Sequence, residues 1–360
     1  MPDRFNVQPG RGAASNPAGR FEPTRSVAAD DSWGSLDEPL PKLETVVRPE
    51  SAQTIIARNR SPDVPFTQSI NPYRGCEHGC PYCYARPSHA YVNLSAGLDF
   101  ETRLFYKAGA ARLLEKELAA KGYVCSPIAL GSNTDPYQPI ERRYNVTREI
   151  LEVLSACSHP VTIVTKGAAL IGRDIDLLAD MARRNLAAVF VSITTLDRNL
   201  KRTLEPRAAS PSARLEAVRR LAGAGVPVGV MVAPVIPALT DHELESILEA
   251  AAEAGATSAG YVMLRLPYEV AELFREWLEV HEPLKAGHVM SRVRALRDGR
   301  DNDPEFGTRM RGTGTWARLF ERRFALARRR LGLDGGAGRF ELDTTRFRPP
   351  VPDSPQRALF

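Results

Sequence analysis

The stretch GCEHGCPYCY, residues 75–84, contains three of the five cysteines of this 360-residue chain. Cys76, Cys80 and Cys83 follow one another with three and then two residues between them. Such clustering, together with an odd number of cysteines, is typical of a metal site in a reducing compartment and not of a disulfide framework. Three thiolates on one short loop are suited to bind a compact centre of a soft metal.

The number of thiols indicates the kind of metal centre. An iron–sulfur cube usually takes four cysteines, so three leave one iron without a protein ligand. An open coordination position is typical of a catalytic metal and not of a structural one. Zinc is an alternative, with His78 or His89 as the fourth ligand, but the sequence has no second pair of closely spaced ligands. Three unrelated thiols are the remaining alternative. We expect an iron–sulfur cluster, and we expect the isolated Cys125 and Cys157 to be inert thiols of the core.

Strand and helix patterns alternate on the C-terminal side of residue 66. Six short apolar runs, each followed by a helical pattern, lie at residues 66–70, 127–131, 161–165, 188–193, 226–232 and 259–264. This order predicts a parallel sheet with helical crossovers, either open or closed into a partial barrel. Ser210-Pro211 and the capping box Thr240-x-x-Glu243 predict two of the helix starts. Neither a Gly-x-Gly-x-x-Gly nor a Walker motif follows a strand, which argues against dinucleotide binding and NTP hydrolysis.

Composition divides the chain into three parts. Residues 1–50 contain seven Pro and four Gly and are expected to form a flexible or extended segment. Residues 51–283 hold the six strand–helix units. Residues 284–360 contain 17 Lys and Arg against 9 Asp and Glu, and we expect a basic, mainly helical extension and tail. Its charge would suit an anionic polymer, although a solvated helix face is the favoured interpretation.

The sequence also gives an expectation about location. The N-terminus has no apolar stretch of signal-peptide length. The longest apolar run, around residues 226–236, is shorter than the roughly 20 residues that a membrane span needs. We therefore expect a cytoplasmic protein without a membrane partner.

The cysteine spacing, with Tyr82 before the last cysteine, resembles the signature of radical S-adenosylmethionine (SAM) enzymes. A finer resemblance, to the spore photoproduct lyase-related (DNA repair photolyase-like) branch, rests on NPYRGC at residues 71–76, TDPYQP at 134–139 and LEP at 204–206. The resemblance covers about residues 66–300. It implies an α/β fold with a partial (β/α)6 TIM-like barrel of parallel strands.

The resemblance also implies a chemistry. Cys76, Cys80 and Cys83 would hold a [4Fe-4S] cluster whose open iron chelates the amino and carboxylate groups of S-adenosylmethionine. Reductive cleavage would give methionine and a 5′-deoxyadenosyl radical, which abstracts hydrogen from a substrate that the sequence does not identify. An external donor such as flavodoxin or ferredoxin would supply the electron, and nucleic acid is a candidate substrate. The alternative is a non-catalytic iron–sulfur or zinc protein that senses redox state or binds a partner.

Polar residues follow several of the predicted strands. In βα barrels the chemistry lies at the C-terminal ends of the strands. Lys166 follows the third strand and is the best candidate to neutralise the carboxylate of S-adenosylmethionine. By resemblance Ser192, Thr195 and Tyr82 are further cofactor contacts. Arg265, after the sixth strand, is predicted either to bind a ligand or to lie at the barrel rim.

Two more residues are candidates for the radical chemistry itself. Lyases of the resembled branch use a cysteine at the end of the second strand to return a hydrogen atom, and this chain has Ser132 there. Because a hydroxyl O–H bond is too strong to donate hydrogen readily to a carbon radical, repair of spore photoproduct itself is not expected. Tyr137 is the nearby radical-capable side chain. Glu205 and Arg207 are predicted to form a structural ion pair.

Overall fold

A seven-stranded sheet forms the centre of the molecule, in a computed structural model that describes residues 7–22, 43–335 and 340–350. Its strands, in spatial order, are β10 (Ser258–Met263), β9 (Val228–Val235), β8 (Ala187–Ser192), β7 (Val161–Thr165), β6 (Ile128–Leu130), β3 (Gln68–Ile70) and β2 (Ile56–Arg58). All neighbours from β3 to β10 are parallel, and β2 is antiparallel to β3. The six predicted strands are confirmed, and β2 is an addition that the sequence did not reveal.

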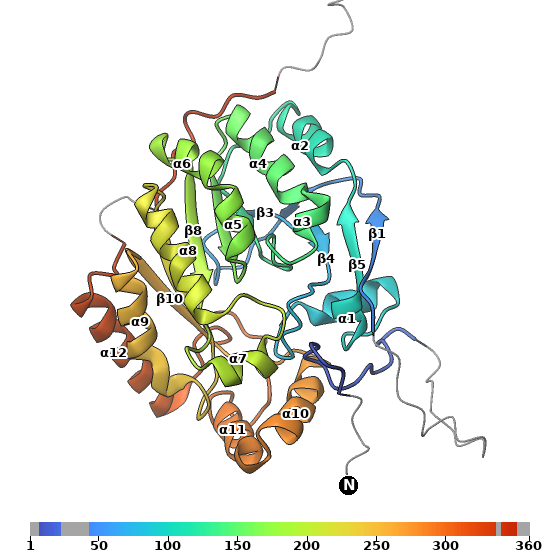
Figure 1. Cartoon of the computed structure of the whole chain (residues 1–360), viewed down its shortest axis with the longest axis vertical. Coiled ribbons are helices and arrows are strands. Elements are labelled where there is room, and N and C mark those ends of the chain that lie inside the picture. Colours follow the sequence, from blue (N-terminus) through green and yellow to red (C-terminus); the bar gives the residue numbers. More distant parts are fainter. Residues whose placement is uncertain (1–6, 23–42, 336–339, 351–360) are drawn as a thin grey trace, which may run out of the picture.

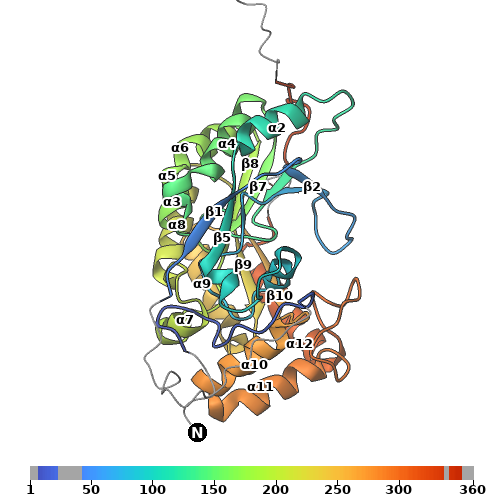
Figure 2. The same ribbon diagram turned by 90° about the vertical axis from the view of Figure 1, so that its right-hand side faces the viewer.

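The helices between the strands cover one face of this curved sheet (Figures 1 and 2). The longer ones are α2 (Ala110–Leu118), α4 (Val146–Ala156), α6 (Ile175–Arg183), α8 (Pro211–Gly223) and α9 (Leu244–Glu253), whereas α10 (Val270–His281) follows the last strand. The short ones are α1 (Asp99–Thr102), α3 (Glu141–Tyr144), α5 (Ala169–Arg173) and α7 (Arg198–Leu204). In α4 the helical spacing of Ile150, Leu151 and Leu154 brings all three into the core. The parallel strands and their covering helices give the predicted partial TIM-like barrel.

Two predicted helix starts have different outcomes. The Ser210 hydroxyl accepts a hydrogen bond from the Ala213 amide at 3.2 Å, which confirms the first cap. The predicted capping box is wrong, because the Thr240 hydroxyl accepts from the Ile236 amide instead. Glu243 is the last residue of a 3₁₀ turn (Asp241–Glu243), and its carboxylate binds residues 195 and 196 of the neighbouring strand end.

The N-terminal part adds a small second sheet and an extended segment. β1 (Val46–Glu50), β5 (Arg103–Lys107) and β4 (Tyr73–Arg74) form three strands in the order β1-β5-β4. Residues 7–22 contain no regular helix or strand and pack against the folded chain. Of residues 1–50, which are expected to be flexible or extended, residues 1–6 and 23–42 lie outside the described ranges.

The C-terminal part contains α11 (Pro283–Ala295) and α12 (Gly314–Arg330), the latter packed against α9. Arg323 pairs with Glu245 at 2.7 Å and Arg330 pairs with Glu249 at 2.5 Å. Carboxylates of α9 thus neutralise part of the charge of the basic helix. None of the helices in the described ranges has the length and apolar character needed to cross a membrane.

Candidate cluster and cofactor site

The cysteine loop connects β4 to a 3₁₀ helix, η1 (Arg86–Val92). Cys76 and Cys80 are buried, Cys83 is partly buried, and all three thiols are free. The loop turns at Gly75 and Gly79, whose φ angles of 76° and 73° are in the left-handed region that favours glycine. The glycines therefore allow one short loop to present three thiols.

The electrostatics of the loop fit a cluster of soft donors. Burial raises the pKa of each thiol, that of Cys80 to about 12, and Asp135 and the other two cysteines raise the pKa of Cys76 further. Within the described ranges no group of three His, Cys, Asp or Glu side chains is placed to hold a single metal ion. An iron–sulfur cube instead binds each thiolate to a different iron.

The two histidines considered as zinc ligands make other contacts. His78 is buried, with its Nδ1 3.4 Å from the Asp135 carboxylate. His89 Nε2 lies 2.9 Å from the carbonyl oxygen of Arg103. The donor set that the loop itself offers is thus three thiols, which fits a cube with one iron left open.

Glu77 anchors the cysteine loop to the rest of the site. Its amide donates to the Gln138 side chain at 2.9 Å, and its carboxylate accepts from Thr45 at 2.7 Å and from Arg207 at 2.8 Å. Arg207 therefore pairs with Glu77, and the predicted Glu205–Arg207 pair is wrong. The reason is local, because the Arg207 amide is held by the His78 carbonyl on the loop side.

Glu205 is the centre of a buried network at the strand ends. Its carboxylate accepts hydrogen bonds from Tyr82, from Arg214 and, at 2.7 Å, from Thr194. Burial raises the pKa of Glu205, but Arg214 and Lys166 lower it more, to about 2. The carboxylate is therefore ionised at neutral pH and is shared by two cations.

Lys166 lies in this network without a close partner. Its ammonium group is 3.3 Å from the Ala233 carbonyl oxygen, 3.9 Å from the Glu205 carboxylate and 5.9 Å from the centroid of the Tyr82 ring. Its charge also lowers the pKa of Cys80 and Cys83, although burial outweighs this effect. An ammonium group has three donors, and these contacts leave it able to bind a ligand carboxylate.

The other predicted cofactor contacts divide into two groups. Ser192 is buried at the end of β8, where its carbonyl accepts from Arg214 at 3.0 Å, so the guanidinium of Arg214 joins it to the Glu205 network. Thr195 instead donates its hydroxyl to Glu243 at 2.5 Å. The structure thus brings Tyr82, Lys166 and Ser192 together and directs the Thr195 hydroxyl elsewhere. Their contacts with a cofactor stay predictions.

The two residues predicted for the radical chemistry lie in different surroundings. Ser132 follows β6, with its hydroxyl 3.3 Å from the Asn71 side chain. Tyr137 is buried in the core, and its hydroxyl makes no hydrogen bond within the described part of the chain. Burial and Asp174 raise the pKa of Tyr137. Catalytic roles for Ser132 and Tyr137 stay predictions.

Tyr84 is a site residue that the sequence did not single out. Its hydroxyl donates to the Ser132 carbonyl, and the Arg265 guanidinium lies 5.5 Å from its ring centroid. Tyr84 thus joins the C-terminal ends of β6 and β10 while 48% of it stays exposed. Its position directly after the last cysteine is the signal that could have identified it. Arg265 itself has a buried Nε atom with no hydrogen-bond partner among the described residues.

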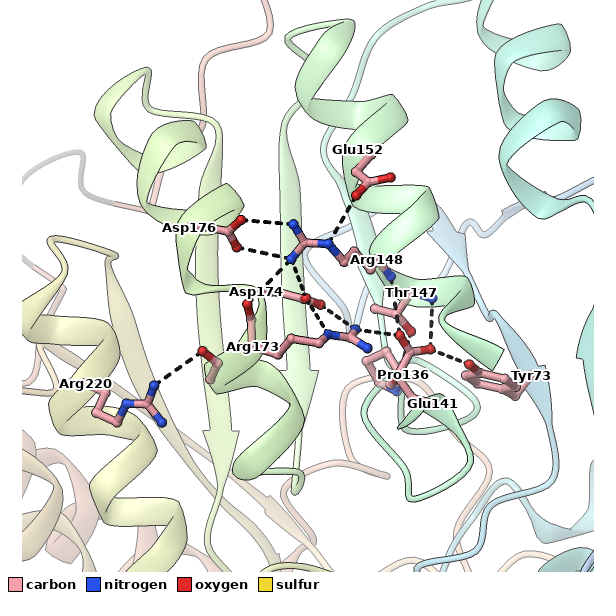
Figure 3. A network of polar contacts seen from close by, with 11 residues as sticks. Tyr73, Pro136, Glu141, Thr147, Arg148, Glu152, Arg173, Asp174, Asp176 and Arg220 are labelled. Atoms are coloured by element: carbon pink, nitrogen blue, oxygen red, sulfur yellow. Dashed lines mark hydrogen bonds and ion pairs between the residues drawn. The ribbon is translucent and has the colours of Figure 1, made fainter. Parts of the chain in front are cut away.

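A second network, in the helical layer, borders the site (Figure 3). Glu141 accepts from the Tyr73 hydroxyl and, at 2.7 Å, from Arg173. Arg173 and Arg148 both bind Asp174, at 2.7 and 3.0 Å. Glu141 and Asp174 are therefore each paired with at least one guanidinium group.

Known proteins resemble the chain in sequence and in fold. The model of the radical SAM superfamily matches residues 70–251. An uncharacterized protein of Mycobacterium tuberculosis is 38% identical over 245 residues, 67% of this chain and 71% of the relative. An uncharacterized protein of Acidianus two-tailed virus is 32% identical over 190 residues, 50% of this chain and 62% of the relative.

Solved structures of spore photoproduct lyase share the fold. One mutant of that enzyme has a TM-score of 0.55 at 15% identity, and a complex with dinucleoside spore photoproduct has a TM-score of 0.56 at 16% identity. Both matches cover 79% of this chain and 79% of the lyase chain. The family match spans the cysteine loop and four of the six parallel strands, β6 to β9. This chain belongs to the radical SAM superfamily.

Proposed function

We propose that Cys76, Cys80 and Cys83 hold a [4Fe-4S] cluster with one open iron, and that this chain abstracts hydrogen from a substrate after cleaving S-adenosylmethionine. The observation that carries the proposal is the Lys166 ammonium group, which has only long contacts beside three free thiols. When bound, the cluster supplies the electron that splits the sulfonium of S-adenosylmethionine into methionine and a 5′-deoxyadenosyl radical.

The residues of the Glu205 network would orient the cofactor. Lys166 neutralises the carboxylate of S-adenosylmethionine, because its positive charge is not consumed by a close ion pair. Glu205 stays ionised and fixes the Tyr82 hydroxyl beside the cysteine loop. Ser192 adds a hydroxyl group at the end of the fourth parallel strand, and Thr195 would do so only by exchanging its hydrogen bond to Glu243. A preorganised network of this kind costs no rearrangement when the cofactor binds.

Anaerobic reconstitution with iron and sulfide tests the proposal. The wild-type chain should take up iron, show the optical and EPR spectra of a cluster, and release 5′-deoxyadenosine when dithionite and S-adenosylmethionine are added. Cys80→Ala should lose the cluster and the product, whereas the matched control Cys125→Ser, which changes a partly exposed thiol outside the loop, should keep both. An unchanged cluster in Cys80→Ala, or one zinc and no iron per wild-type chain, would contradict it and favour a non-catalytic metal protein.

For the substrate we propose a nucleic acid. The fold is that of spore photoproduct lyases, one of which is described in complex with a dinucleoside photoproduct. In this chain Tyr84 and Arg265 provide an exposed aromatic ring and a guanidinium group that has no carboxylate within ion-pair distance in the described ranges. Such a pair suits a base stacked on the ring and a neighbouring phosphate. Pairing with α9 makes the arginines of α12 a weaker candidate for this role.

Binding of a fluorescently labelled single-stranded oligonucleotide tests the substrate class. We expect the affinity to fall steeply as salt concentration rises, since bound phosphates release counterions. Arg265→Gln should weaken binding on the order of tenfold, and the control Arg330→Gln, on the outside of α12, should change it much less. Absence of binding, or an affinity that does not change with salt concentration, would favour a small molecule or a protein side chain as the substrate.

A further inference from the structure

We propose that residues 10–22, which we call the strap, are a working part of the cluster site and that Glu101 is the positioning residue through which the strap holds the cysteine loop. The proposal rests on the proposed cluster site. In Figure 1 the strap is the dark blue segment that passes between α1 and α10. It is far from the cysteines in sequence, but three sets of contacts join it to the cysteine loop and a fourth joins it to α10.

The strap touches the loop directly at Gly12. A Cβ atom built on Gly12 would lie 1.6 Å from the carbonyl oxygen of Gly79 and 3.1 Å from the ring of Pro81. No side chain fits in that space without moving one of the two backbones. The strap backbone is therefore in contact with the part of the loop between the first and third cysteines.

Glu101 joins the strap to the loop through a buried ion pair. Its carboxylate accepts from the amides of Gly12 and Ala13, at 3.0 and 2.9 Å, and it also binds Arg86. Arg86 donates from Nε to the carbonyl oxygen of Cys80 at 2.8 Å. Both charged side chains are fully buried. Since a buried ion pair is stable only when its remaining hydrogen-bonding groups are satisfied, removal of the strap amides would loosen the pair and the loop that it supports.

Arg11 provides a second connection. Its guanidinium donates to the carbonyl oxygens of Glu101 and Leu43, at 3.1 and 3.0 Å, and to the Thr45 hydroxyl at 2.9 Å. The same hydroxyl donates to Glu77, which lies directly after the first cysteine of the loop. Arg11 therefore supports the loop at Glu77, whereas Arg86 holds it at Cys80.

The C-terminal half of the strap is fixed at α10. The Ser15 hydroxyl donates to Glu276 at 2.6 Å. Arg20 pairs with Glu269 at 2.6 Å, with its guanidinium carbon 4.0 Å from the centroid of the Tyr268 ring. These contacts hold the strap across the loop at both ends. The strap is thus a built element of the site and not merely a linker.

The reactivity of the cysteines in the apo-protein tests the proposal without depending on enzyme activity. We would compare wild type with Gly12→Ala and with the matched control Gly19→Ala, whose added methyl group would meet only the Glu22 side chain, at 3.5 Å. Anaerobic labelling with N-ethylmaleimide, resolved by peptide mass spectrometry, gives one rate for each cysteine. Gly12→Ala should raise the rates of Cys76 and Cys80 on the order of tenfold by opening the loop. Gly19→Ala should not raise them, and Cys125 should be unchanged in both variants.

Two further variants keep the test decisive. Circular dichroism shows whether Gly12→Ala is folded; if it is not, Arg11→Gln and Glu101→Gln, which add no bulk, replace it. Each should raise the labelling rates and lower the iron bound per chain after reconstitution to less than about half of wild type. Wild-type labelling and iron content in all folded variants would overturn the role of the strap. If the variants are labelled faster but the wild-type chain binds no cluster after reconstitution, the role of the strap is supported and the proposed function is overturned.

Discussion

Two buried carboxylates, Glu205 at the strand ends and Glu141 in the helical layer, are surrounded by different balances of charge. Glu205 is shared by Arg214 and Lys166, so this network has one negative and two positive groups. Glu141 shares Arg173 with Asp174, and further carboxylates surround the neighbouring guanidinium groups (Figure 3). The helical layer is complete without a ligand. Within the Glu205 network the two cations exceed the one carboxylate, and a ligand carboxylate would balance this charge.

The largest effect should come from removing the Glu205 carboxylate. Glu205→Gln leaves the Arg214 guanidinium without its buried partner, so the free energy of unfolding should fall by about 3 to 5 kcal/mol. Glu141→Gln should cost less, because Arg173 keeps Asp174 as a buried partner. Urea denaturation of the apo-proteins measures this loss. Only Glu205→Gln should also reduce 5′-deoxyadenosine formation per cluster-loaded chain. Equal effects of the two substitutions on 5′-deoxyadenosine formation would show that the Glu205 network has no special role in the reaction.

Acid should weaken the Glu205 network in a defined pH range. The pKa of Glu205 is lowered from 4.5 to about 2, because the pull of Arg214 and Lys166 outweighs burial. A lowered carboxyl pKa means that its stabilisation is complete above the unfolded pKa and is lost as pH falls toward the folded one. We expect a loss of about 3 kcal/mol across that range.

Unfolding free energies at several pH values measure this acid effect. The difference between wild type and Glu205→Gln should shrink as pH falls from about 5 to about 2, because the carboxylate becomes protonated in both states. The control Leu154→Ala removes a fully buried apolar side chain, so its difference from wild type should not depend on pH. A Glu205→Gln difference that stays constant in this range would show that the carboxylate is not held by its cations.

Replacing Lys166 should lower the affinity for S-adenosylmethionine, whereas replacing a cation of the Glu141 network should not. Lys166→Met removes a charge that has only long contacts, so stability should change little while S-adenosylmethionine binds roughly ten- to a hundredfold more weakly. Equilibrium dialysis with cluster-loaded protein measures the affinity. The counterpart Arg148→Met removes a guanidinium group that binds Asp174 and Asp176, and it should affect stability alone. Unchanged affinity in Lys166→Met would remove the main support for the cofactor site.

The sequence was sufficient for the parts of the fold that depend on local patterns. Apolar runs such as residues 161–165 coincide with their strands because both faces of a parallel sheet are buried. The spacing of the three cysteines singles out the loop, and Lys166 is singled out by its place after the third strand; the roles of these residues stay predictions. Short strands such as β2 and β4 carry too few residues for a periodic signal.

Partners distant in the chain could not be predicted in this way. Arg207 was assigned to the nearest carboxylate in sequence, but it binds Glu77, 130 residues away. Glu243 looked like a capping residue, and the neighbouring strand end uses it instead. The strap was missed because its fixation depends on Glu101, whose role becomes visible only when the two segments meet in space.

The smallest effect, and the sharpest test, comes from two tyrosines in matched positions. Tyr73 donates its hydroxyl to Glu141, and Tyr82 donates its hydroxyl to Glu205. Replacing either with Phe removes one hydrogen bond to a buried charge, so each variant should lose about 1.5 kcal/mol of unfolding free energy in urea denaturation. If the networks were equivalent, the two variants would also behave alike toward S-adenosylmethionine.

We expect them to differ, because the Tyr82 ring lies 5.9 Å from the Lys166 ammonium group and its hydroxyl helps to hold the carboxylate that faces this cation. Tyr82→Phe should therefore weaken S-adenosylmethionine binding by a few fold, whereas Tyr73→Phe should leave it at the wild-type value. Since the two variants remove the same group and lose similar stability, a difference in affinity reports only the surroundings of the carboxylate. Equal affinities would show that cofactor binding by the positively charged Glu205 network does not depend on the Tyr82 hydroxyl. Lys166 would then bind the cofactor carboxylate without help from Tyr82.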